Sequence, residues 1–151
     1  LASGSKDGTF KLWSLQTLKI QKTITGYKSG IAGGDGRGAF NSDGKTIAAI
    51  GMVNDKSKIK LWSVQTGELL QILNSTTEAH AMWSLAFSPD GKILAGGTLD
   101  TFSVKLWSVE TGQEIQTLTG HSKPVTAVAF SPNGQTLASI DIRTIKLWRI
   151  N

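Results

Sequence analysis

The chain has 151 residues, of which 39% are hydrophobic and 18% charged, the balance of a folded domain and not of a disordered segment. No apolar run approaches the roughly 20 residues of a membrane helix, and the absence of cysteine excludes disulfide bonds and thiol chemistry and favours a cytoplasmic location. The net charge is +5, but lysine and arginine are spread singly along the sequence, so we do not expect a nucleic-acid surface.

A short apolar motif recurs along the chain. The tripeptide Lys-Leu-Trp occurs four times, at residues 11–13, 60–62, 105–107 and 146–148. A spacing of roughly forty to fifty residues is typical of architectures built from stacked repeats. The repeats divide the chain into four units, at about residues 1–25, 26–73, 74–118 and 119–151.

The first unit predicts three strands. The segment LASGS, the motif at residues 11–13 and the residues that follow the SLQT turn supply them, because each is short and bounded by turn residues. Compared with the later units, this unit lacks an innermost strand.

The second and third units each predict four strands. Asp-Gly pairs at 43–44 and 90–91 suit hairpin turns, and the apolar stretches after them are partly β-branched. The Lys-Leu-Trp segments follow, and Thr-Gly pairs at 66–67 and 111–112 turn the chain into a fourth strand. The second unit opens with a glycine-rich insertion, residues 26–38.

The fourth unit predicts three strands around the Asn-Gly turn at 133–134 and the motif at 146–148. Units of four antiparallel strands that are apolar on both faces must stack face to face, as β-propeller blades do. The sequence therefore predicts an all-β partial propeller of about three and a half four-stranded blades.

Residues 120–148, GHSKPVTAVAFSPNGQTLASIDIRTIKLW, resemble the WD40-repeat family, in particular large bacterial multi-repeat members. In that family a histidine, a serine or threonine, an aspartate and the tryptophan form a hydrogen-bonded network inside a blade. The resemblance implies structural roles for eight residues: Trp13, Trp62, Trp107, Trp148, His121, Ser139, Ser3 and Asp7. Asp141 lies one place out of register with the aspartate of the network.

The chain departs from the family pattern in two ways. The Trp-Asp dipeptide is replaced by Trp-Ser three times and by Trp-Arg once, and the single clear Gly-His pair is at 120–121. We therefore expect incomplete polar networks and blades held together by apolar packing.

An open arc of blades leaves unpaired strand edges, which favour association with another chain. We expect the chain to be the C-terminal part of a larger propeller, whose upstream segment supplies the missing outer strand. Self-association that closes the ring is the alternative.

Two glycine motifs resemble nucleotide-binding loops, but their context argues against that function. Residues 39–46 match a relaxed P-loop and residues 34–39 a loose dinucleotide fingerprint. Both motifs need a strand before them and a helix after them. The repeat instead predicts that the first motif contains a hairpin turn followed by a strand. No strand-to-helix unit surrounds the second motif. We find no catalytic set, no metal-ligand spacing and no cofactor motif.

The residue expected to anchor a partner is Trp83, the one tryptophan outside the Lys-Leu-Trp motifs. It lies near the start of an innermost strand, where the last repeat has Thr126, and aromatic residues dominate interface hot spots. Packing between blades is the alternative role. The other candidates lie on loops at the same end of the sheets: Lys6, Asp55, His80, Asp100, Lys123 and Asp141. The aspartates would favour a basic partner, or instead cap their own turns.

The sequence thus predicts a scaffold that binds other proteins and is not an enzyme. The alternatives are a propeller enzyme whose active site needs further blades, and a basic surface that binds nucleic acid.

Overall fold

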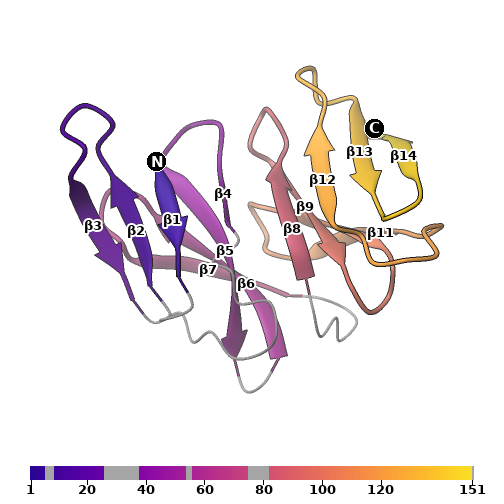
Figure 1. Ribbon diagram of the computed structural model, residues 1–151, viewed down its shortest axis with the longest axis horizontal. Coiled ribbons are helices and arrows are strands. Elements are labelled where there is room, and N and C mark those ends of the chain that lie inside the picture. The colour runs from indigo at the N-terminus through magenta and orange to yellow at the C-terminus, as the bar shows by residue number, and fades with distance from the viewer. Residues whose placement is uncertain (6–8, 26–37, 54–55, 75–81, 151) are drawn as a thin grey trace.

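The computed structural model describes residues 1–5, 9–25, 38–53, 56–74 and 82–150, and every regular element in these ranges is a β-strand (Figure 1). The strands form four antiparallel sheets of three, four, four and three strands. No described segment is a helix that could cross a membrane. The prediction of an all-β partial propeller is confirmed.

The sheets follow one another along the chain. Sheet 1 consists of β1 (Ala2–Gly4), β2 (Phe10–Trp13) and β3 (Ile20–Ile24), and sheet 2 of β4 (Gly38–Phe40), β5 (Thr46–Val53), β6 (Lys56–Ser63) and β7 (Leu69–Leu73). Sheet 3 consists of β8 (Met82–Phe87), β9 (Ile93–Thr98), β10 (Val104–Ser108) and β11 (Glu114–Leu118). Sheet 4 consists of β12 (Ala127–Phe130), β13 (Thr136–Ile140) and β14 (Ile145–Arg149).

The same hairpin turn joins the first two strands of sheets 2, 3 and 4. Its glycine has a positive φ of 67° at Gly44 and 73° at Gly91 and Gly134, a region that residues with a Cβ rarely adopt. The preceding side chain accepts a hydrogen bond from the backbone N–H two residues later, as Asp43 Oδ1 does from Lys45 at 2.8 Å. Strand β5 follows this turn, so residues 39–46 form a hairpin and not a phosphate-binding loop.

The four Lys-Leu-Trp motifs occupy equivalent strands. Trp62, Trp107 and Trp148 pair with Ile47, Leu94 and Leu137 on the preceding strand, and the Trp13 N–H donates to the Leu1 carbonyl at 2.8 Å in the same manner. In sheets 1, 2 and 3 the register with the outer strand shifts between the leucine and the tryptophan.

Apolar clusters form between successive sheets. Leu12 and Trp62 are buried in one cluster, and Leu61 and Trp107 in another. Leu106 is buried in a third cluster, against which the partly buried Trp148 packs. The leucine of one motif thus lies with the tryptophan of the next. Burial of this apolar surface is the main term that stabilises the stack. Each sheet is therefore held by its neighbours, as in a solenoid or a propeller.

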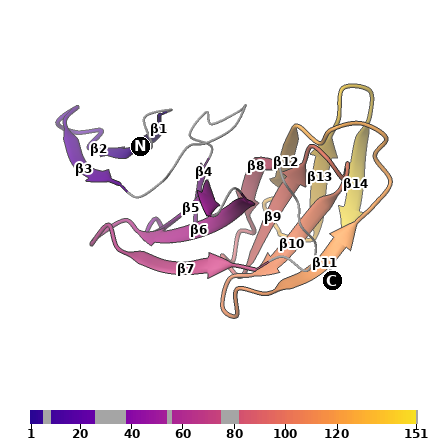
Figure 2. The same cartoon turned by 90° about the horizontal axis from the view of Figure 1, so that it is seen from below.

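The stack curves. Figure 2 shows the sheets along an arc, with sheet 1 at one end and sheet 4 at the other. Strands β4, β8 and β12 are the inner strands of their sheets, and β8 is in contact with both of the others.

Candidate binding surface

Trp83 is the extra residue of a β-bulge at the start of inner strand β8. Met82 pairs with Thr98 and Ser84 with Gly97, so Trp83 has no opposite residue on β9. Strand β12 pairs with β13 in regular register. Since a bulge re-aims a side chain and is over-represented next to functional sites, the half-buried indole of Trp83 is placed differently from its counterpart Thr126.

The structure brings three predicted residues together around Thr98. This threonine pairs with Met82, next to Trp83, and its carbonyl accepts a hydrogen bond from the Val125 N–H at 3.0 Å. Lys123 lies two residues before Val125, and the exposed Asp100 two residues after Thr98. Trp83, Asp100 and Lys123 thus share one end of sheets 3 and 4, which we call the loop-end surface.

Phe102, in the same turn as Asp100, is strained. Its φ is 51°, in the left-handed region that costs a residue with a Cβ about 1–2 kcal/mol. Such strain clusters at functional sites. Sequence reasoning missed this residue and the bulge at Trp83, because neither position carries a glycine that would mark a turn or a bulge.

His121 is at the centre of a hydrogen-bonded network inside sheet 4. The Trp148 indole N–H donates to Ser139 Oγ at 2.8 Å, and Ser139 Oγ lies 2.6 Å from His121 Nε2. His121 Nδ1 lies 2.8 Å from Asp141 Oδ2. Because an indole can only donate, every group is satisfied when the Ser139 hydroxyl donates to Nε2 and Nδ1–H donates to Asp141.

Asp141 completes the network despite its shift in register. Its other oxygen, Oδ1, accepts the backbone N–H groups of Arg143 and Thr144 at 2.8 and 2.7 Å. Burial alone raises the pKa of Asp141, but the hydrogen bonds from Arg143, His121 and Thr144 lower it by more, so the pKa lies far below its ordinary value.

Ser139, His121 and Asp141 have the connectivity of a hydrolase triad, with the histidine between the hydroxyl and the carboxylate. Their burial argues against that chemistry. Ser139 is 0% exposed and Asp141 4%, so a substrate has no access to the hydroxyl. Ser139 Oγ also accepts the Trp148 N–H, and the geometry supports a structural role.

Two sequence-based expectations need correction. The network in sheet 4 is complete, because the turn after β13 is tight enough for Asp141 to reach His121. For the same reason Asp141 caps its own turn and is buried, so it does not join a ring of exposed carboxylates.

The other sheets differ from sheet 4 in the hydrogen-bond acceptor available to the indole N–H of the motif tryptophan. In sheet 1 the Trp13 indole donates to Ser3 Oγ at 2.8 Å. The equivalent positions of sheets 2 and 3, opposite Lys60 and Lys105, are Ala49 and Gly96, which have no hydroxyl. In sheet 3 the Trp107 indole N–H donates instead to the Asn74 carbonyl at 2.8 Å. The remaining predicted residues, Lys6, Asp7, Asp55 and His80, lie outside the described residues.

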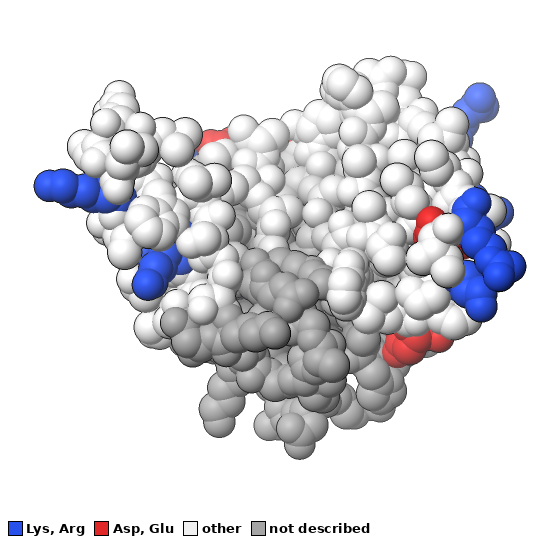
Figure 3. Space-filling view, in the orientation of Figure 1, with Lys and Arg blue, Asp and Glu red and all other residues white. Residues whose placement is uncertain are grey.

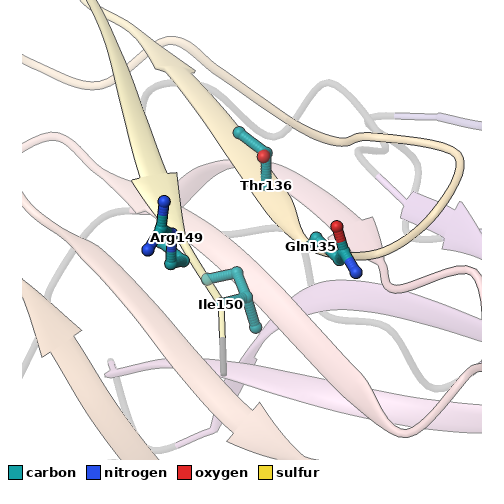
Figure 4. A pocket seen from close by; sticks show the side chains of 4 residues that line it. All are labelled: Gln135, Thr136, Arg149 and Ile150. Carbon is teal, nitrogen blue, oxygen red and sulfur yellow. The ribbon is translucent and has the colours of Figure 1, made fainter.

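The opposite end of sheets 3 and 4 carries two pockets. One, of about 390 Å³, is lined by Gln135 and Thr136 at the start of β13 and by Arg149 and Ile150 at the end of β14 (Figure 4). The other, of about 270 Å³, lies between the hairpin turns that contain Gly91 and Gly134. Within the described residues, no three His, Asp or Glu side chains could hold a metal ion together.

Charge is not concentrated on the face seen in Figure 3. Among the described residues on this face, lysine and arginine side chains lie at two separate ends of the molecule, and the described surface between them is mostly uncharged with a few acidic side chains. Nucleic-acid binding requires a continuous basic patch or stripe, and the described residues on this face do not form one.

The repeat architecture agrees with the comparison with known families. The model of the family described as "WD domain, G-beta repeat" matches residues 1–14, 67–108 and 112–149, more than half of the chain. The chain belongs to the WD40-repeat family. Members of this family generally mediate protein–protein interactions, and nothing in the described residues gives positive evidence of an enzyme.

Several curated proteins are similar to this chain. WD repeat-containing protein SL1-17 of Schistosoma mansoni is 34% identical over 99% of the chain and 46% of its own length, and WD repeat-containing protein VIP3 of Arabidopsis thaliana is 32% identical over 91% and 44%. Human apoptotic protease-activating factor 1 is 36% identical over 64% of the chain and 8% of its own length. The chain thus spans less than half of each. These relatives are eukaryotic and do not support the resemblance to bacterial proteins.

Proposed function

We propose that the chain is a non-catalytic scaffold for protein–protein interaction and that the loop-end surface binds the partner, with Trp83 as its anchor. The bulge at Trp83 carries this proposal, because it sets an aromatic side chain apart from the regular ladder at the end where the inner strands begin. Asp100 and Lys123 supply opposite charges at the same end of sheets 3 and 4, and these would orient a polar partner.

We propose further that the four sheets are one arc of a larger ring, and that the ring is completed by other sheets. The support is the exposed apolar surface at the end of sheet 4, where Ile142 and Leu147 are 73% and 71% exposed. Exposed apolar surface of this kind marks an interface. A cytoplasmic location, suggested by the absence of cysteine, is part of the same proposal.

A comparison of Trp83→Ala with the parent chain tests the anchor. Proteins captured by the immobilised parent should be recovered about thirtyfold less efficiently with Trp83→Ala, the effect of a hot spot worth about 2 kcal/mol. Leu15→Ala is the matched control, because Leu15 is 70% exposed. It lies in the turn between β2 and β3, at the end of sheet 1 that is opposite to the loop-end surface. Equal recovery by all three chains would contradict the proposal.

A stability measurement separates the binding role of Trp83 from a packing role. If the indole fills space between sheets, Trp83→Ala lowers the free energy of unfolding by about 3–5 kcal/mol. A binding role predicts a loss of capture with a smaller loss of stability.

A further inference from the structure

The pocket of about 270 Å³ lies between the hairpin turns of sheets 3 and 4. The loop-end surface is at the other end of these sheets, so the pocket is a separate site. Its lining includes three apolar side chains and three polar ones: Pro89, Ile93 and Ile150, and Asp90, Asn133 and Gln135. The pocket thus combines apolar walls with one carboxylate and two amides.

The equivalent space between sheets 2 and 3 is filled by Asn41. This asparagine is 9% exposed, and its Nδ2 donates to the Gly91 carbonyl at 3.5 Å. A Cβ added to Gly91 would collide with the Asn41 amide. The Asn41 side chain therefore occupies the space between the two hairpin turns.

Ser88 has the place of Asn41 in sheet 3 and leaves the next space open. Its hydroxyl turns back into its own hairpin, where it donates to Asp90 Oδ1 at 2.6 Å and accepts the Ile93 N–H at 3.0 Å. Across the pocket, the nearest described atom to a Cβ added to Gly134 would be Pro89 Cδ, at 3.5 Å. The pocket exists because a short serine replaces an asparagine.

Asp90 gives the pocket a negative charge. The hydrogen bonds from the Ser88 hydroxyl and the Lys92 N–H hold the pKa of Asp90 below its ordinary value, so the group is ionised at neutral pH. A carboxylate has about four acceptor sites, so these two bonds leave it able to accept others. Lys92 is the other charged residue of this hairpin and is exposed, so solvent screens its charge.

We propose that this pocket binds the side chain of an arginine of a protein partner. The aliphatic stem packs on Pro89, Ile93 and Ile150, and the planar guanidinium donates to the Asp90 carboxylate, which matches its geometry. The volume is slightly below the roughly 300–1,000 Å³ of small-molecule sites and suits one long side chain. This site does not depend on the binding role of Trp83.

A nuclear magnetic resonance titration of the isotope-labelled chain with N-acetylarginine amide tests the proposal. The amide signals of Gly91, Gly134 and Gln135 should shift and saturate, with a dissociation constant on the order of 1 mM for this single side chain. The citrulline derivative, which has a similar shape and no charge, should bind about tenfold more weakly. Equal binding of the citrulline or lysine derivative, or shifts that do not saturate, would overturn the proposal. A preference for free arginine over the blocked residue would indicate a metabolite site and would also overturn it.

Asp90→Asn removes the charge and should keep the hairpin. Asn133 forms the same turn in sheet 4, where its Oδ1 accepts the Ser131 hydroxyl and the Gln135 N–H at 2.7 and 3.1 Å. Asp90→Asn should weaken arginine binding about tenfold. Asp43→Asn, the same change in the hairpin of sheet 2, is the matched control and should bind like the parent. Equal affinities of the two variants would overturn the proposal.

Ser88→Asn should fill the pocket as Asn41 fills its counterpart. The saturable shifts should disappear, while signals away from the two hairpins stay where they are in the parent. Undiminished binding would place the arginine elsewhere and overturn the proposal. Capture of partners through Trp83 should be the same in all these variants, so either proposal can fail without the other.

Discussion

Leu61 of sheet 2 and Trp107 of sheet 3 are buried in the same apolar cluster, 2% and 1% exposed. They are the leucine of one Lys-Leu-Trp motif and the tryptophan of the next. The repeated motif thus determines how neighbouring sheets pack, because each motif supplies one residue to the interface before it and one to the interface after it.

Removal of the Leu61 side chain should weaken this interface. Leu61→Ala is expected to lower the free energy of unfolding by about 2–5 kcal/mol, since it removes a fully buried side chain and leaves a cavity. Leu15→Ala, at a leucine that is 70% exposed, should change it by less than about 0.5 kcal/mol. Urea titrations followed by tryptophan fluorescence measure both, and similar losses would contradict the account.

Gly96 leaves the space that the Trp107 ring occupies. A Cβ at this position would lie 2.9 Å from Trp107 Cζ3 and 3.4 Å from Leu85 Cδ2. Gly96→Ala should therefore cost about 1–3 kcal/mol through overpacking. Gln116→Ala, at an exposed site of the same sheet, is the control, and thermal unfolding compares the two. A Gly96→Ala chain as stable as the parent would show that the ring is not confined.

The network of sheet 4 predicts a difference between two serines that bond to tryptophan. Ser139→Ala leaves the His121 and Trp148 nitrogens without their buried partner, at a cost of about 1–3 kcal/mol. Ser3→Ala removes an exposed Ser–Trp hydrogen bond and should cost less than about 1 kcal/mol. Denaturant titrations of both variants test this order.

The same burial predicts that Ser139 does not react as a nucleophile. A fluorophosphonate probe, which labels activated serines of hydrolases, should leave the parent chain unlabelled. Labelling of the parent chain that disappears in Ser139→Ala would contradict the structural role of Ser139 and support the alternative that the protein is an enzyme.

The lowered pKa of Asp141 predicts how stability depends on pH. The unfolded chain binds the proton at the ordinary value near 3.8, more readily than the folded chain, so protonation favours unfolding. The contribution of Asp141 is therefore complete above that value and is lost as the pH falls below it. The difference in unfolding free energy between the parent and Asp141→Asn should be constant near neutral pH and shrink below about pH 4. A difference that grows on acidification would contradict the network.

The sequence predicted most of the fold, because a propeller blade is built from local signals. The turns at Gly44, Gly91 and Gly134 and the four tryptophans mark strands at fixed places within each unit. The strand counts of the four sheets agree with the prediction for the same reason.

The binding surface was less predictable. The reach of Asp141 to His121 depends on the geometry of a short turn, and the bulge at Trp83 on a mismatch between two strands. Neither is visible in residue types alone. Phe102 shows the same limit, since a strained φ at a non-glycine residue is imposed by its surroundings.

Nuclear Overhauser spectroscopy of the indole protons tests the central claim most directly. Stacked equivalent sheets predict contacts from Trp62 to the methyl groups of Leu12, from Trp107 to those of Leu61, and from Trp148 to those of Leu106. Indoles with unrelated neighbours, and none of these three contacts, would contradict the repeat architecture and the functions inferred from it.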